Sequence, residues 1–415
     1  MNSHQENCDL LLEAGRLLLT YNESTEEIHH ALQTLAARAG EKQVAIAVEY
    51  LQITVSIGNE IAGSRTIKGI HYNNAALTNV HEILRQACSD KLSIADAKRS
   101  LQEVEQSTPR YTQAAVTLFL AVGAIALAAL LGADKGGAVV AGVSTALGFV
   151  VRQWLQRFRV SIFTLPFAAA FVGALTGGVA VRSGWTHTPG LALIVPCLML
   201  VPGPHLINGL LDFIDNRLPM SVARLALANG ILLAVGLGLL IGIELIFPQP
   251  PEMKQGFKVE QLHVVADMLL ASAVTAGFAV FYNTRWPHIS QAVAGGAIGH
   301  GLRSLALSNG WGLEASTFLG GLAVGLCAAW MSRFSKTPLA TVAFAGAVTM
   351  MPGLQMYAAL RGAVQLARQL PLDEAAPALA TLSNGAQAAA VVAALSLGLL
   401  IAARASQAFF RERAG

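Results

Sequence analysis

Residues 113–131 read QAAVTLFLAVGAIALAALL and contain no charged side chain. A helix needs about 20 mostly apolar residues to cross the hydrocarbon core of a bilayer. The run continues with little interruption, because the only charged residues from Gln113 to Val151 are Asp134 and Lys135. This stretch therefore predicts membrane-spanning helices and sets the fold class expected for the rest of the chain.

The composition of the whole chain points the same way. Of its 415 residues, 13% are charged and 54% are hydrophobic, whereas a soluble protein is about one quarter charged. The formal net charge of +3 is too small to indicate a nucleic-acid partner, and we expect none. The lipid bilayer is the first partner that the sequence predicts.

The cysteines and the N-terminal residues limit the chemistry and the location that we expect for this chain. The four cysteines, at positions 8, 88, 197 and 327, form no CxxC pair, so we predict no disulfide framework and no metal site. No motif indicates a cofactor. The first residues, MNSHQENCDLLLEAGR, lack the positively charged region and uninterrupted apolar core of a secretory signal. We therefore expect the N-terminal part to stay in the cytosol.

Residues 1–110 carry charged side chains at ordinary density and predict a cytosolic α+β domain. Leucines at helical spacing predict a helix over residues 10–18, and STEE at 24–27 predicts a capping box at the start of a second. Ranges 44–48, 51–57 and 61–67 predict a small sheet, with turns at 58–59 and near Gly63. Two further helices are expected at about 73–88 and 93–105.

This domain offers no catalytic constellation. His29 and His30 are adjacent, so they point about 100° apart on a helix, and no HExxH or CxxC spacing accompanies them. No GxSxG elbow surrounds a serine, as a nucleophile of that class would require. We predict that the chain is not an enzyme.

Beyond residue 110, apolar runs alternate with short polar breaks and predict ten transmembrane helices. Their approximate ranges are 113–131, 136–151, 161–181, 189–203, 221–247, 262–282, 288–308, 314–331, 337–353 and 382–403. Five spans fall in residues 111–250, the first membrane repeat, and five in residues 251–415, the second. We interpret 354–370 as an amphipathic or re-entrant helix on the outer side.

Basic residues set the orientation, because cytosolic loops carry an excess of Lys and Arg. An N-terminus in the cytosol places these residues there as well: Arg152, Arg157, Arg159, Arg333, Lys336, Arg411 and Arg413. Arg361 and Arg368 oppose the scheme. We expect a multi-pass protein of the cell inner (cytoplasmic) membrane with its N-terminal domain and C-terminus in the cytosol. A homo-oligomer is compatible with the sequence.

A pair of motifs recurs at a spacing of about 150 residues. TP at 188–189 precedes VPG at 201–203, and TP at 337–338 precedes MPG at 351–353. Because five spans is an odd number, the second copy enters the membrane with the opposite polarity. We therefore predict two inverted five-helix repeats, an arrangement that supports alternating access of a solute to the two sides.

Corresponding Pro-Gly breaks in two halves are the best sequence pointer to a solute site, because a broken helix exposes backbone groups that need protein or a wet cavity. The alternative is that Pro-Gly merely ends a helix at the membrane surface. Eight residues at or near the breaks and in the fifth span are our candidates for a substrate pathway: Pro202, Gly203, His205, Asn208, Asn229, Pro352, Gly353 and Gln355.

Ionisable residues inside a helix bundle are functional candidates by default. Asp212 and Asp267 are predicted to carry a coupled proton, because a desolvated carboxylate can have its pKa raised toward neutral pH. Arg303 and His300 are candidates for binding an anionic group. A purely structural alternative pairs the carboxylates with arginines: Asp212 and Asp215 with Arg217 or Arg224, and Asp267 with Arg303.

The sequence resembles the threonine/serine exporters, which join an N-terminal soluble domain to a ten-span membrane domain. The N-terminal likeness rests on LLLEAGRLLLTYNESTEEIHHALQTLAARAG and ends at TPRY, residues 108–111. The membrane likeness rests on LVPG at 200–203 with Asn208, Gly209 and Asp212, and on MMPG at 350–353. Together these segments cover nearly the whole chain.

The resemblance implies a secondary transporter that exports small amino acids such as L-threonine and L-serine, driven by the proton gradient. Split relatives of the family are associated with dicarboxylate export, so a carrier of a dicarboxylate such as succinate is the alternative. A reading from another class makes the N-terminal domain a membrane-tethered hydrolase or a ligand-sensing module.

Overall fold

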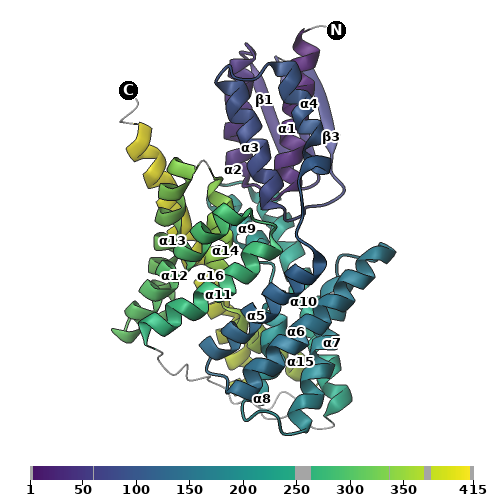
Figure 1. The fold of residues 1–415 in the computed structure, drawn as a ribbon, viewed down its shortest axis with the longest axis vertical. Helices are drawn as coiled ribbons and strands as arrows, with labels where there is room; N and C mark the ends of the chain where they lie inside the picture. The colour runs from purple at the N-terminus through teal and green to yellow at the C-terminus, as the bar shows by residue number, and fades with distance from the viewer. Residues whose placement is uncertain (1–2, 59, 248–262, 336, 369–374, 412–415) are drawn as a thin grey trace.

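The computed structural model describes residues 3–58, 60–247, 263–335, 337–368 and 375–411. The N-terminal elements form one layer, and the remaining helices lie beneath it (Figure 1). The N-terminal layer contains four helices and three strands: α1 (Ser3–Thr20), α2 (Thr25–Arg38), β1 (Val44–Glu49), β2 (Gln52–Ile57), β3 (Glu60–Thr66), α3 (Asn74–Cys88) and α4 (Ile94–Ser107).

The three strands form an antiparallel sheet in the order β1-β2-β3. The predicted turn near Gly63 is wrong, because Gly63 lies inside β3 and pairs with Val55 next to a β-bulge. A Cβ atom at this position would lie 2.6 Å from the Leu12 side chain. Gly63 therefore lets α1 pack closely on the sheet.

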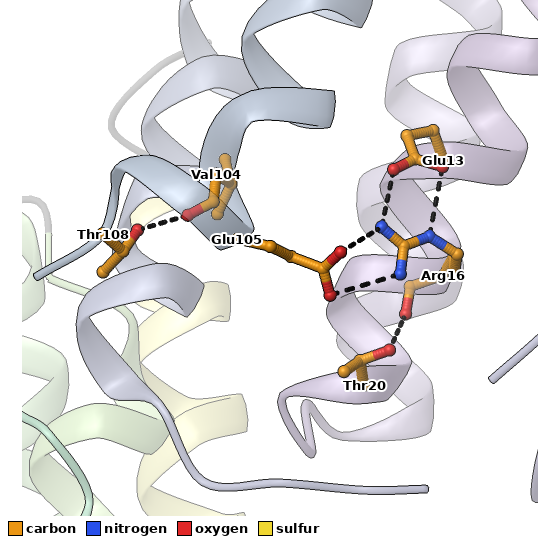
Figure 2. Close-up of polar contacts among 6 residues, drawn as sticks. All are labelled: Glu13, Arg16, Thr20, Val104, Glu105 and Thr108. Atoms are coloured by element: carbon orange, nitrogen blue, oxygen red, sulfur yellow. Dashed lines mark hydrogen bonds and ion pairs between the residues drawn. The ribbon is translucent and has the colours of Figure 1, made fainter. Parts of the chain in front are cut away.

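Leucines on α1 form the core of the N-terminal layer, and Leu10, Leu11, Leu17 and Leu18 are fully buried. An ionic contact at the surface ties α1 to α4. Figure 2 shows Arg16 between Glu13 of its own helix, at 2.7 Å, and Glu105 of α4, at 3.3 Å. Arg16 donates hydrogen bonds to both carboxylates, and these bonds raise the pKa of Arg16, so the guanidinium stays charged.

The capping box predicted at residues 24–27 is only half formed. The Ser24 hydroxyl accepts a hydrogen bond from the Glu27 amide at 3.2 Å, as an N-cap residue should. Glu27 does not reach back, since the Ser24 amide donates to Glu23 at 2.8 Å instead. Glu27 is thereby left facing away from the cap, toward the lower helices.

The lower part of the molecule is a bundle of helices. They are α5 (Gln113–Leu130), α6 (Lys135–Leu155), η1 (Gln156–Phe158), α7 (Thr164–Arg182), α8 (Pro189–Leu198), α9 (Gly203–Ile214), α10 (Leu218–Ile246), α11 (Val264–Phe281), α12 (Trp286–Ser308), α13 (Leu313–Ser335), α14 (Leu339–Val348), α15 (Gly353–Arg368) and α16 (Ala375–Arg411). Lys336 and Arg413, which we assigned to the cytosol, lie outside the described residues.

Among the described residues, seven helices are long and apolar enough to cross a membrane. Two bent pairs, α8 with α9 and α14 with α15, raise the number to nine if each pair is one span. Helix α12 corresponds to the predicted span at 288–308, but it carries polar and charged side chains and is not among the nine. The chain is a polytopic helical membrane protein.

Helix contacts in α5–α10 recur in α11–α16. In the first set α5 packs on α6, α6 packs on α7, and α10 packs on both α7 and α9. In the second set α11 packs on α12, α12 packs on α13, and α16 packs on both α13 and α15. The two sets meet through α5 against α11, and the bent pairs reach across, α9 to α16 and α15 to α10. Each bent pair therefore contacts both sets of helices.

Candidate functional site

Both Pro-Gly motifs break a helix inside the bundle. Helix α8 ends at Leu198 and α9 begins at Gly203, with a bend of 62° between them. Helix α14 ends at Val348 and α15 begins at Gly353, with a bend of 60°. Proline lacks an N–H donor and clashes with the preceding turn, so neither helix can continue straight through the motif.

The two breaks lie against each other. A Cβ atom on Gly203 would come within 2.9 Å of the Val348 side chain, at the end of α14. A Cβ atom on Gly353 would come within 2.6 Å of the Leu198 side chain, at the end of α8. Each glycine thus packs on the last residue of the other broken helix, and both motifs are buried rather than placed at a helix end on the surface.

A cavity of about 400 Å³ opens beside the second break. Its polar lining residues come from α11, α12 and the α14–α15 break: Asp267, His300, Arg303, Ser304, Thr349 and Gln355. Pro352 and Gly353 form part of the same wall, and most other lining residues are leucine, valine or phenylalanine. An apolar cavity with a few convergent polar groups is the usual form of a small-molecule site.

Inside this cavity Asp267 pairs with His300, through a short contact between a carboxylate oxygen and Nδ1 of the imidazole. The side chain of His300 is almost wholly buried, and its Nε2 atom has no hydrogen-bond partner within the described residues. Arg303 donates from Nε to the Thr317 hydroxyl at 3.2 Å. The predicted alternative that paired Asp267 with Arg303 is therefore wrong. Asp267 pairs with His300, and Arg303 lines the cavity as a separate charged group.

The other candidate carboxylate, Asp212, lies on a polar face of α9 with His205 and Asn208. Asp212 and Arg224 of α10 form an ion pair at 3.2 Å, and both side chains are almost fully buried. Asn208 donates to the backbone oxygen of Asn22 at 2.9 Å, and Arg224 donates to that of Glu23 at 2.8 Å. This face of α9 is thus covered by the loop between α1 and α2.

The structural alternative is correct for Asp212, but Asp215 pairs with neither predicted arginine. Asp215 contacts Arg404 of α16. Arg217 contacts Glu26 of α2 instead. These two contacts lie at the edge of the N-terminal layer, where Glu26 and Arg404 are largely exposed.

A second cavity, of about 600 Å³, lies where α2 and α3 face α9, α14 and α16. Glu23, Glu27 and His81 line it from above, and Asn208, Asp212 and Asp215 from below. Burial lowers the pKa of His81, but a 2.7 Å hydrogen bond to Glu23 and the charges of Glu23 and Glu27 outweigh it and raise the pKa. Burial, then the charge of Glu23, raises the pKa of Glu27.

Asn229, the remaining candidate, lies apart from both polar cavities. Its amide donates to the Leu225 backbone oxygen of its own helix at 2.9 Å. It lines an apolar cavity of about 390 Å³ between α8, α10, α15 and α16. The structure therefore brings the other candidates near the breaks and leaves Asn229 on an outer face of α10.

Two residues near the first break were missed by the sequence interpretation. Tyr72, in the segment before α3, lies against His205 and Tyr282, with ring centroids 5.5 Å and 5.0 Å away. The Arg152 guanidinium of α6 lies 5.4 Å from the centroid of the Phe281 ring. No sequence signal marked Tyr72, and Arg152 was assigned to a loop because it ends an apolar run.

Among the described residues, no group of three or more His, Cys, Asp or Glu side chains could hold a metal ion. The arrangement is instead one of buried charges around a cavity at the crossing of two broken helices.

This fold and this site define a membrane transport protein. Residues 9–246 match a family model described as a threonine/serine exporter, and residues 267–404 match a second, described as threonine/serine exporter, ThrE. The chain belongs to the threonine/serine exporter family. No solved structure matches it.

Proposed function

We propose that the protein exports a small zwitterionic amino acid of the threonine or serine type, driven by the proton gradient. The observation that carries the proposal is the mixture of charges in the cavity at the second break. Arg303 provides a cation there, and Asp267 provides a carboxylate. A zwitterion carries one group complementary to each, and Gln355 and Thr349 add polar atoms for a hydroxyl.

The Asp267–His300 pair is the proposed site of proton coupling. Both the carboxylate and the imidazole can bind a proton, so a single proton changes the charge of this pair. The amino acid's ammonium group would compete with that proton for Asp267. Because the proton and the amino acid compete for Asp267, they bind in turn from opposite sides of the membrane, and this couples their movements.

The Asp212–Arg224 pair is less suited to the same task, although we had named both carboxylates. An arginine keeps its proton in proteins, so protonating Asp212 would leave a buried cation without its partner. That penalty is several kcal/mol. We therefore propose that Asp267, rather than Asp212, carries the proton.

For the topology we propose a cytosolic domain at residues 1–110 and inverted five-span repeats at 111–250 and 251–415. The paired helix contacts and the reciprocal packing of Gly203 and Gly353 support this division. Counting α12 and each bent pair as one span gives the ten spans of the scheme. The N-terminal layer then lies in the cytosol, and the protein lies in the cell inner membrane.

The test is efflux from proteoliposomes loaded with labelled L-threonine or L-serine. We expect an imposed pH gradient, acidic outside the compartment that holds the amino acid, to accelerate efflux. Efflux at the same rate with and without the pH gradient would contradict the proposed proton coupling. Absence of efflux of both amino acids would contradict the proposed substrate.

A dicarboxylate such as succinate is the second candidate, because Arg303 places a cation in the cavity and the His300 imidazole lines the same cavity. Asp267 opposes it, since its negative charge would repel a second carboxylate. Efflux of labelled succinate and of labelled threonine from the parent protein decides between the two, because a dicarboxylate exporter would have no threonine transport. We expect the parent protein to export threonine and Arg303→Ala to lose that transport.

A further inference from the structure

The two bent pairs give the bundle two equivalent positions for a cavity, and the position beside the second break is open. The open cavity is lined by Leu130, Leu131, Arg303 and Gln355. In the other half, the counterparts of these residues at an offset of 150 or 151 positions are Phe281, Tyr282, Arg152 and His205. Three of these four counterparts are the ring neighbours of Tyr72: Phe281, Tyr282 and His205.

The fourth counterpart, Arg152, has a position in α6 that matches the position of Arg303 in α12. Arg152 and Arg303 are 151 positions apart, the same offset as the first residues of their helices, Lys135 and Trp286. The Arg152 guanidinium lies 5.0 Å from the Phe149 ring centroid and 5.4 Å from that of Phe281. No carboxylate is paired with it within the described residues, and its Nε atom is buried without a hydrogen-bond partner.

Tyr72 is held in this position by the start of α3. The amides of Asn74 and Ala75 donate to the backbone oxygens of Tyr282 and Asn283, at 2.8 Å and 3.0 Å. These bonds join the first turn of α3 to the end of α11. The Tyr72 hydroxyl and the Nδ1 atom of His205 are both buried without a hydrogen-bond partner among the described residues.

Unpartnered polar atoms are rare in a packed interior, because each costs about 1–3 kcal/mol. Here they converge from Arg152, Tyr72 and His205 on one place. Such a group of atoms suits a site that takes a polar ligand when Tyr72 is absent.

We propose that Arg152 is the cytosolic counterpart of Arg303, an inference that rests on the proposed function. Arg152 binds the carboxylate of the amino acid on the cytosolic side once Tyr72 withdraws from the site. Tyr72 closes this position in the structure, while the cavity at Arg303 is open. Withdrawal of Tyr72 requires α3 to separate from the end of α11. The two arginines then bind the same carboxylate in turn, one at each side of the membrane.

The transport test compares the two faces. In everted vesicles, where the N-terminal layer faces the medium, Arg152→Gln should raise the KM for L-threonine roughly tenfold to a hundredfold, the loss expected for a hydrogen bond to a charged group. In right-side-out vesicles the same variant should leave the KM unchanged, and Arg303→Gln should show the reverse. Arg157→Gln is the matched control, because Arg157 is an exposed arginine in η1, directly after α6. Equal effects of Arg152→Gln at both faces, or none at either, would overturn the assignment.

A labelling test does not depend on transport. His205→Cys places a thiol beside Tyr72, and a membrane-impermeant maleimide added to everted vesicles reports its accessibility above the background of the parent chain. Adding Tyr72→Ala should accelerate labelling roughly tenfold, and adding Tyr72→Phe, which keeps the ring, should not. Equal labelling in all three chains would refute the closure by Tyr72. If threonine is not transported at all, the proposed function fails while this measurement still decides the role of Tyr72.

Discussion

Two buried carboxylates in this bundle differ in their partners and in the cavities that they line. Asp212 pairs with Arg224 beneath the N-terminal layer, where both side chains are almost fully buried. Asp267 pairs with His300 in the wall of the cavity beside the second break. Because arginine keeps its charge and histidine does not, the first pair has a fixed charge state and the second can exchange a proton. Asp212 and Arg224 therefore form a fixed pair, and Asp267 and His300 form the pair that we propose for proton coupling, the coupling pair, although sequence position alone made the two carboxylates equal candidates.

The largest effect is expected from breaking the fixed pair. Asp212→Ala leaves Arg224 buried without its partner, which costs about 3–5 kcal/mol. We expect a large loss of folded protein, measured by thermal unfolding in detergent. Arg404→Ala breaks the exposed contact with Asp215 and should cost about 0–1 kcal/mol. If Asp212→Ala unfolds at the temperature of the parent protein, the pair does not stabilise the fold.

The crossing of the two breaks is tested by its glycines. Gly203→Ala and Gly353→Ala each force a methyl group into the other broken helix, and overpacking of this kind costs about 1–3 kcal/mol. We expect both to lower the unfolding temperature by similar amounts. Gly385→Ala is the control, because its new methyl group would have ordinary contact at 3.8 Å and alanine favours a helix by about 1 kcal/mol. A loss at only one break would contradict the reciprocal packing.

The coupling pair is tested by removing its titratable partner. His300→Gln should slow gradient-driven threonine efflux roughly tenfold or more, because a positioned proton carrier is lost, while threonine–threonine exchange continues. His288→Gln on the same helix is the control. It removes an imidazole that forms a hydrogen bond with Thr337, outside the cavity, and should leave gradient-driven efflux intact. Equal losses in the two variants would show that the effect comes from helix packing.

The smallest effect concerns the N-terminal layer. The folded-state pKa of His81 is raised above its unfolded value, so its stabilising contribution is complete below about pH 6.5 and is lost as the pH rises through the folded-state pKa. His81→Gln should therefore destabilise the protein by about 1 kcal/mol at pH 6 and much less at pH 9. The exposed His30→Gln is the control in thermal unfolding at both pH values. A cost that is the same at both pH values would mean that no charge is involved.

The sequence predicted the helices of the bundle well, because uninterrupted apolar runs and Pro-Gly breaks are local features. Every predicted span has a helix, from 113–131 at α5 to 382–403 at α16. The segment 354–370, predicted to be an amphipathic or re-entrant helix, is α15, the second arm of a bent pair. Local pattern does not distinguish a re-entrant helix from the second arm of a broken span, because both need a short apolar helix after a proline.

Partners and directions of side chains were less predictable. The pairing of Asp267 with His300 depends on how α11 packs on α12, and periodicity does not specify it. Asn229 was placed in the pathway because it is polar in an apolar span, but in lipid-embedded helices the apolar pattern does not mark one face as internal. Tyr72 lies outside every apolar run, so its insertion beside the first break depends on the docking of a whole layer.

The most direct test of the account is proton movement during threonine transport, followed with a pH-sensitive dye inside proteoliposomes. We predict that a threonine gradient moves protons through the parent protein. Asp267→Asn should move none, and it should exchange threonine only with a raised KM, because the amide no longer pairs with the ammonium group. Proton movement that persists in Asp267→Asn, or threonine transport by the parent protein without any proton movement, would contradict the central claim.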